Sequence, residues 1–64
     1  MKRKLLEWKQ YGKSQIAEGN TLIFAYQKVG RNHLLLIEAN GLATRLICKT
    51  ERDCLMISNI LNKV

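Results

Sequence analysis

Two apolar stretches, His33 to Ala39 and Leu42 to Lys49, lie on either side of Asn40-Gly41, and this is the clearest local pattern in the chain. Both residues of the dipeptide tolerate a positive φ, as the two-residue turn of a type I′ hairpin requires. Such a turn pairs Ala39 with Leu42 and fixes the register of the residues that precede and follow them. The sequence therefore predicts a hairpin with strands over residues 33–39 and 42–49.

The same register predicts a sheet that is apolar on both faces. One face receives the cross-strand pairs Ile37–Thr44, Leu35–Leu46 and His33–Cys48. The other receives Glu38–Ala43, Leu36–Arg45 and Leu34–Ile47. One helix covers only one face, so the other needs the N-terminal segment, a second subunit or a ligand. We therefore expect a homo-oligomer, with Leu34, Leu36 and Ile47 as interface residues.

A second hairpin is predicted around Gly19-Asn20, with Ala17 opposite Leu22 and Ile16 opposite Ile23. The strand that follows is rich in β-branched and aromatic residues. Residues 30–32 then form a short turn into the strand that begins at His33. The strands of the predicted antiparallel meander lie near residues 13–18, 21–29, 33–39 and 42–49.

The hydrophobic period changes after Thr50, which is a suitable N-cap, with Asp53 placed to reach back to it. Acidic residues at positions 51 and 53 suit the positive end of a helix dipole. One apolar stripe then carries Cys54, Ile57, Leu61 and Val64, whereas Ser58 falls largely outside it. The pattern predicts an amphipathic helix over about 51–63, packed on one face of the sheet.

Residues 1–12 are compatible with two structures. Leu5, Trp8 and Tyr11 recur every three residues, and Gly12 would then end a helix. Leu6, Trp8 and Gln10 alternate as in a strand, and we favour the strand because one helix already covers a sheet face.

The predicted fold class is α+β: an antiparallel meander of three to four strands packed by one C-terminal amphipathic helix. Residues 1–64 form a single small domain, because 64 residues and 7.4 kDa suffice for one core. The side chains expected to be most buried are Leu35, Ile37, Leu46, Ile57 and Leu61.

The small number of potentially catalytic side chains argues against an enzyme. The chain has one histidine, His33, two cysteines, Cys48 and Cys54, and scattered acids, with no Cys-x-x-Cys or Gly-rich phosphate loop. The cysteines are expected to be free thiols, and a zinc site made with His33 would lack a fourth ligand. We expect no catalytic residue, no metal and no cofactor. Apolar runs such as Leu34 to Ile37 are too short to span a membrane, and the basic start lacks a signal-peptide core, so a cytoplasmic location is expected.

Charge gives the main indication of function. The net charge is +6, and five of the eleven cations lie in the first thirteen residues against one acid, Glu7. Lysines interleaved with aromatic residues suit phosphates and stacked bases. The expected nucleic-acid-binding residues are Lys2, Arg3, Lys4, Trp8, Lys9, Tyr11, Lys13, Lys28 and Arg31. Phe24 and Tyr26 are a second candidate platform, although a mid-strand aromatic residue is more often part of the core.

These features predict a small basic binding protein that engages nucleic acid, most simply single-stranded DNA or RNA. The alternative is a protein interaction module, an inhibitor or adaptor, that docks through the uncovered apolar sheet face. In that case the basic surface would steer it to an acidic protein partner.

Overall fold

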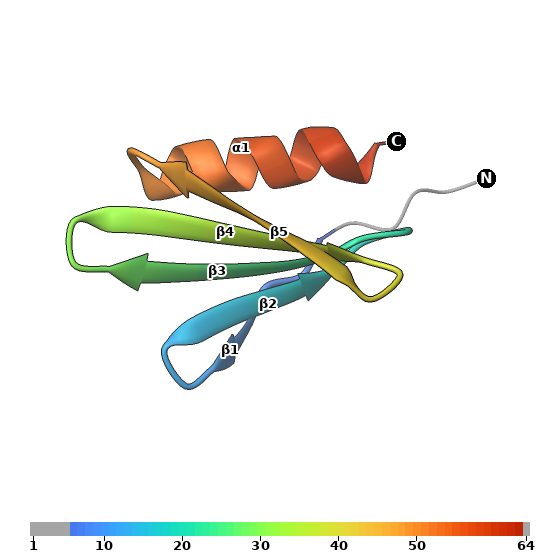
Figure 1. Ribbon diagram of the computed structural model, residues 1–64, viewed down its shortest axis with the longest axis horizontal. Helices are drawn as coiled ribbons and strands as arrows, with labels where there is room; N and C mark the ends of the chain where they lie inside the picture. Colours follow the sequence, from blue (N-terminus) through green and yellow to red (C-terminus); the bar gives the residue numbers. More distant parts are fainter. Residues whose placement is uncertain (1–5, 64) are drawn as a thin grey trace.

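Each strand pairs with the next strand along the chain, so the sheet is an antiparallel meander in the order β1-β2-β3-β4-β5. The computed structural model describes residues 6–63 (Figure 1). The elements are β1 (Lys9–Tyr11), β2 (Ser14–Glu18), β3 (Ile23–Val29), β4 (Asn32–Ala39), β5 (Leu42–Cys48) and α1 (Glu51–Asn62). The α+β class is confirmed, and the sheet has one strand more than the four expected.

The additional strand, β1, comes from the segment that the sequence left open. Lys9–Tyr11 pair with Ser14–Ile16 around Gly12, whose φ of +60° is one that glycine adopts without strain. For Lys9–Tyr11 the strand interpretation is therefore confirmed, and the helix that would end at Gly12 is wrong. Leu5 lies outside the described residues.

The hairpin between β4 and β5 has the predicted register throughout. Ala39 pairs with Leu42, and each of the other predicted pairs as far as His33 with Cys48 is present. The φ angles of Asn40 and Gly41 are +52° and +81°, as a type I′ turn demands. Local sequence alone was sufficient here, because a two-residue turn fixes the register of the strands that it joins.

The register predicted between β2 and β3 is wrong by two residues. Ala17 pairs with Phe24 rather than Leu22, and Ile16 pairs with Ala25 rather than Ile23. The loop therefore contains four residues, Gly19 to Leu22, closed by a bond from the Gly19 N–H to the Leu22 carbonyl of 2.8 Å. A shift of two leaves every side chain on its predicted face.

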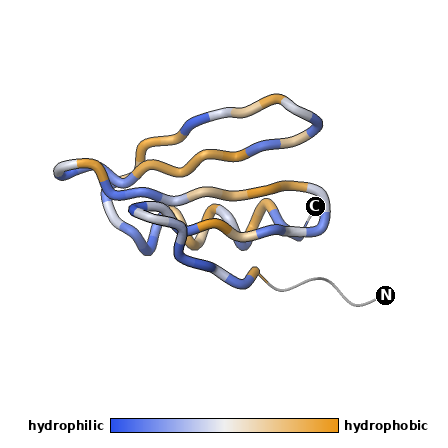
Figure 2. Tube along the Cα trace, turned by 90° about the horizontal axis from the view of Figure 1, so that it is seen from below, coloured by the Kyte–Doolittle hydropathy of each residue, from blue (hydrophilic) through white to orange (hydrophobic). Residues whose placement is uncertain are grey.

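Helix α1 packs on one face of the sheet. Thr50 is its N-cap, since its hydroxyl accepts from the Asp53 N–H at 3.1 Å. The buried cluster beneath α1 consists of Phe24, Tyr26, Leu35 and Cys54. Figure 2 shows the hydrophobic stretches that run through the strands and the mixed character of the helix.

The predicted core was only partly right. Leu35 is fully buried, whereas Ile37, Leu46, Ile57 and Leu61 are half-buried and surround the cluster. Phe24 and Tyr26 belong to the core, which excludes them as an exposed stacking platform. Ser58, which was expected outside the apolar stripe, is completely buried, and Val64 lies outside the described residues.

Candidate nucleic-acid interface

The face of the sheet opposite α1, here the open face, is covered by no element of the described chain (Figure 1). Successive pairings align one row of side chains across all five strands: Tyr11, Ser14, Gln27, Leu34 and Ile47. At the usual spacing of neighbouring strands, such a row is about 19 Å long. Tyr11 is 58% exposed and Ile47 69% exposed, so both ends of the row are accessible.

The next row of the open face has a cation at each end. It consists of Lys9, Ile16, Ala25, Leu36 and Arg45. Lys9 and Arg45 are exposed, whereas Leu36 in the middle is half-buried. The open face thus has an apolar middle and positive charge at its two edge strands, β1 and β5.

Four further cations lie together at one end of the sheet. The β1–β2 turn, the β3–β4 turn and the end of β5 meet there, because Ser14 pairs with Gln27 and His33 with Cys48. All four side chains are exposed, and we call them the basic end: Lys13, Lys28, Arg31 and Lys49. None of the four has an ion-pair partner among residues 6–63.

Sequence reasoning identified three residues of the basic end and missed Lys49. Lys49 is separated from Arg31 by eighteen positions in the chain, so neither composition nor local spacing connects them. The predicted hairpin nevertheless contained the information needed to place Lys49 near Arg31. Antiparallel pairing of 33 with 48 places residue 49 beside the turn that precedes residue 33.

Acidic residues are concentrated away from the strands and turns of the basic end. Glu18 and Glu38 both flank Ile23 in one cross-strand row at the opposite end of the sheet. Glu51 and Asp53 lie beside the basic end, in the first turn of α1, where the helix dipole favours negative charge. Along its strands, the sheet is therefore positively charged at the basic end and negatively charged at the opposite end.

Trp8 and Tyr11 lie on different faces. Trp8 is half-buried and packs against the core cluster under α1, together with Leu6. Tyr11 projects from the open face beside Lys9, two residues away in the same strand. The two aromatic side chains therefore do not form one surface. Lys2, Arg3 and Lys4 lie outside the described residues.

The titratable groups near the core serve packing. The Tyr26 hydroxyl and His33 Nδ1 share a hydrogen bond of 2.7 Å, and their rings stack. Burial raises the pKa of Tyr26, with a smaller contribution from Glu51. Cys48 and Cys54 are both free thiols. Within residues 6–63, no group of three histidine, cysteine or acidic side chains is placed to hold a metal ion.

Comparison with models of protein families, with curated protein sequences and with solved structures gives no match. No helix of the described residues is long and apolar enough to cross a membrane.

Proposed function

We propose that the protein is a non-enzymatic binder of single-stranded DNA or RNA. Phosphates contact the basic end, and bases lie on the open face next to it. The single observation that carries the proposal is the gathering of four exposed cations from three separate segments at one end of the sheet.

The basic end suits a phosphate backbone. Its side chains come from turns and strand ends, so they can follow a flexible polyanion without disturbing the sheet. Lysine and arginine that neutralise phosphates release condensed counterions, which drives binding at low salt. Arg31 in the β3–β4 turn can also engage a phosphate with two parallel hydrogen bonds.

The open face suits single-stranded nucleic acid better than a duplex. Tyr11 offers an exposed ring for a base, and Leu34 and Ile47 continue an apolar surface along the same row. Between them, Ser14 and Gln27 supply polar groups, already joined by a 3.3 Å hydrogen bond. Unstacked bases can reach this row, whereas the bases of a duplex stay inside the helix, and each stacked base contributes about 1–3 kcal/mol.

The test is fluorescence anisotropy with single-stranded oligonucleotides and the matching duplex. Lys13→Gln, Arg31→Gln and Lys49→Gln should each weaken binding, because each removes one phosphate contact. Lys63→Gln is the matched control: it removes one charge from the far end of α1, and binding should stay unchanged. Equal effects of all four variants, or no binding at low salt, would contradict the proposal.

A second candidate function is docking on another protein through the open face. It is favoured by the exposure of three apolar side chains there: 69% for Ile47, 47% for Val29 and 41% for Ile23. Such a patch is also the natural interface of a homodimer that buries Leu34 and Leu36. Sedimentation velocity of the wild-type chain and of Ile47→Asp tests this candidate. A monomer at micromolar concentration, unchanged by the substitution, would count against a dimer formed through this face.

A further inference from the structure

We propose a second binding site along the outer edge of β5, which shares Ile47, Arg45 and Lys49 with the proposed nucleic-acid interface. There an extended acidic peptide segment of a partner protein adds a strand to the sheet and places apolar side chains against α1. The site has three components: an unpaired strand edge, an apolar groove and a local excess of positive charge.

The unpaired edge belongs to β5, the last strand of the sheet, which has β4 as its only neighbour among the described strands. Its seven residues pair with β4 in an unbroken register, without a bulge, and the chain contains no proline. Bulges and prolines are common means of blocking a strand edge. The outer backbone groups of β5 can therefore pair with an added strand.

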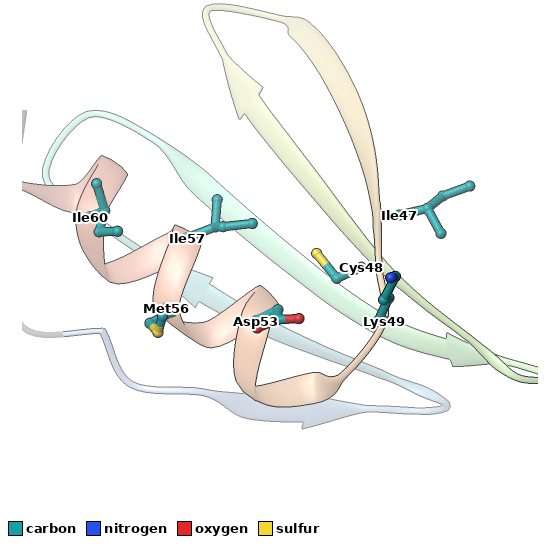
Figure 3. Close-up of a pocket in the computed structure, with 7 residues that line it drawn as sticks. All are labelled: Ile47, Cys48, Lys49, Asp53, Met56, Ile57 and Ile60. Carbon is teal, nitrogen blue, oxygen red and sulfur yellow. The ribbon is translucent and has the colours of Figure 1, made fainter.

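The groove runs between β5 and α1 and has a volume of about 340 Å³. Its apolar lining comes from Cys48 of β5 and from Met56, Ile57 and Ile60 of α1, and Ile47 borders it from the open face. Figure 3 shows Cys48 directed towards the helix and Ile47 away from it. Met56 and Ile60 are 52% and 58% exposed, so the helix wall lacks apolar cover. A strand beside β5 would direct every second side chain into this groove.

The charge at the β5 edge indicates which side chains the added strand should carry on the face away from α1. Arg45 is exposed on the open face of β5, and Lys49 lines the groove. Asp53 of the first turn of α1 also lines the groove and offsets the charge of Lys49, so the excess positive charge at this edge comes from Arg45. A peptide that alternates apolar and acidic residues presents its apolar side chains to α1 and its carboxylates to Arg45.

A second copy of the chain fits this edge less well. Antiparallel pairing of β5 with itself about its central residue sets Arg45 directly opposite the same arginine. It also joins two chains that each carry a net charge of +6. Like charges directly opposite in a sheet are destabilising, so the observations favour an acidic peptide over self-pairing.

The probe is a peptide as long as β5, Asp-Val-Asp-Leu-Asp-Val-Asp, labelled for anisotropy. The matched control replaces each aspartate with lysine. Two further peptides carry N-methyl groups on the odd or on the even backbone amides. Strand addition uses the amides of one edge, so one methylated peptide should bind and the other should not.

Three variants locate the site. Arg45→Glu and Ile60→Asn should each weaken the aspartate peptide about tenfold, and Arg45→Glu should gain affinity for the lysine peptide. Tyr11→Ala, on the other edge strand, is the control and should change nothing. Because these side chains are exposed, thermal unfolding should confirm that all three variants fold.

Four results would overturn this assignment: equal binding of the acidic and basic peptides, equal binding of both methylated peptides, no effect of Ile60→Asn, or no binding of the aspartate peptide. A concentration-dependent dimer that Ile60→Asn dissociates would assign the groove to a second copy instead. None of these measurements involves nucleic acid, so they leave the proposed function untouched.

Discussion

Ser58 is as inaccessible to solvent as Phe24, although serine is ordinarily a surface residue. Its hydroxyl donates to the Cys54 carbonyl at 2.8 Å, one turn earlier in α1, which removes the cost of burying an unpaired polar group. Hydropathy does not register such a bond, so the apolar stripe predicted from sequence missed Ser58. The position of Ser58 four residues after Cys54, where its hydroxyl can bond the Cys54 carbonyl, was the only indication in the sequence that it could be buried.

At the scale of residues, we expect the two cysteines to differ in reactivity. Burial, followed by the neighbouring Cys48 and the acids Asp53 and Glu51, raises the pKa of Cys54 to about 12. The thiol also lies 3.7 Å from the His33 carbonyl, to which it can donate. Because the thiolate is the nucleophile, alkylation at pH 8 followed by mass spectrometry should modify half-buried Cys48 first. Equal rates for both thiols in the folded protein would contradict this.

The Cys54 thiol should also make the free energy of unfolding depend on pH in the alkaline range. The pKa of Cys54 is ordinarily about 9.0 in an unfolded chain, whereas burial raises the pKa of the folded thiol to about 12. The folded state therefore binds more protons within this window, and the free energy of unfolding falls as pH rises through it. Urea unfolding at pH 8 and pH 10 should show the loss. Cys54→Ala should show a smaller loss, and an equal loss would contradict the assignment to Cys54.

At the scale of elements, the two predicted hairpin turns differ because one of them is held by a distant residue. Asn20 donates from its backbone N–H to Asn62 Oδ1 at 2.9 Å and from its side chain to the Asn62 carbonyl at 3.1 Å. These bonds tie the β2–β3 loop to the end of α1. A contact across forty-two positions leaves no local trace, so the sequence predicted a tighter turn and the wrong register.

Gly19 is required by this close approach. A Cβ at this position would overlap the Asn62 side chain and lie 3.1 Å from the Leu22 carbonyl. We expect Gly19→Ala to lower the free energy of unfolding by about 1–3 kcal/mol, as overpacking does. Urea denaturation of Gly19→Ala and of Gly19→Ala/Asn62→Gly measures the effect. The double variant should recover part of the loss if the overlap with Asn62 is its cause, and no recovery would exclude that cause.

The N-cap of α1 gives an independent test of the helix. Thr50→Ala removes the hydroxyl that accepts from the Asp53 N–H, at an expected cost of about 1 kcal/mol. Thr50→Ser keeps the acceptor and should remain close to wild type. Chemical denaturation measures the free energy of unfolding of both variants. If Thr50→Ala is as stable as Thr50→Ser, the hydroxyl does not cap the helix.

At the scale of the whole molecule, one helix covers one face of a sheet that is apolar on both. The apolar stretches in residues 33–48 were enough to predict both faces, because the register of the β4–β5 hairpin follows from its turn. The excess of positive charge was also evident from the sequence. Its concentration at the basic end was predicted only in part, because Lys49 joins the other three cations only when the pairing of β4 with β5 is followed to its end.

The salt dependence of binding to a single-stranded oligonucleotide tests directly whether the basic end contacts phosphates. Affinity for a single-stranded oligonucleotide is measured from about 50 to about 200 mM salt for wild type, Lys63→Gln and the double variant Lys13→Gln/Arg31→Gln. If the basic end holds the phosphates, the double variant should reduce the slope of log K against log salt by about 1.4, since each lost contact removes about 0.7. Lys63→Gln should keep the wild-type slope. Identical slopes for all three proteins would show that the basic end does not contact the phosphates.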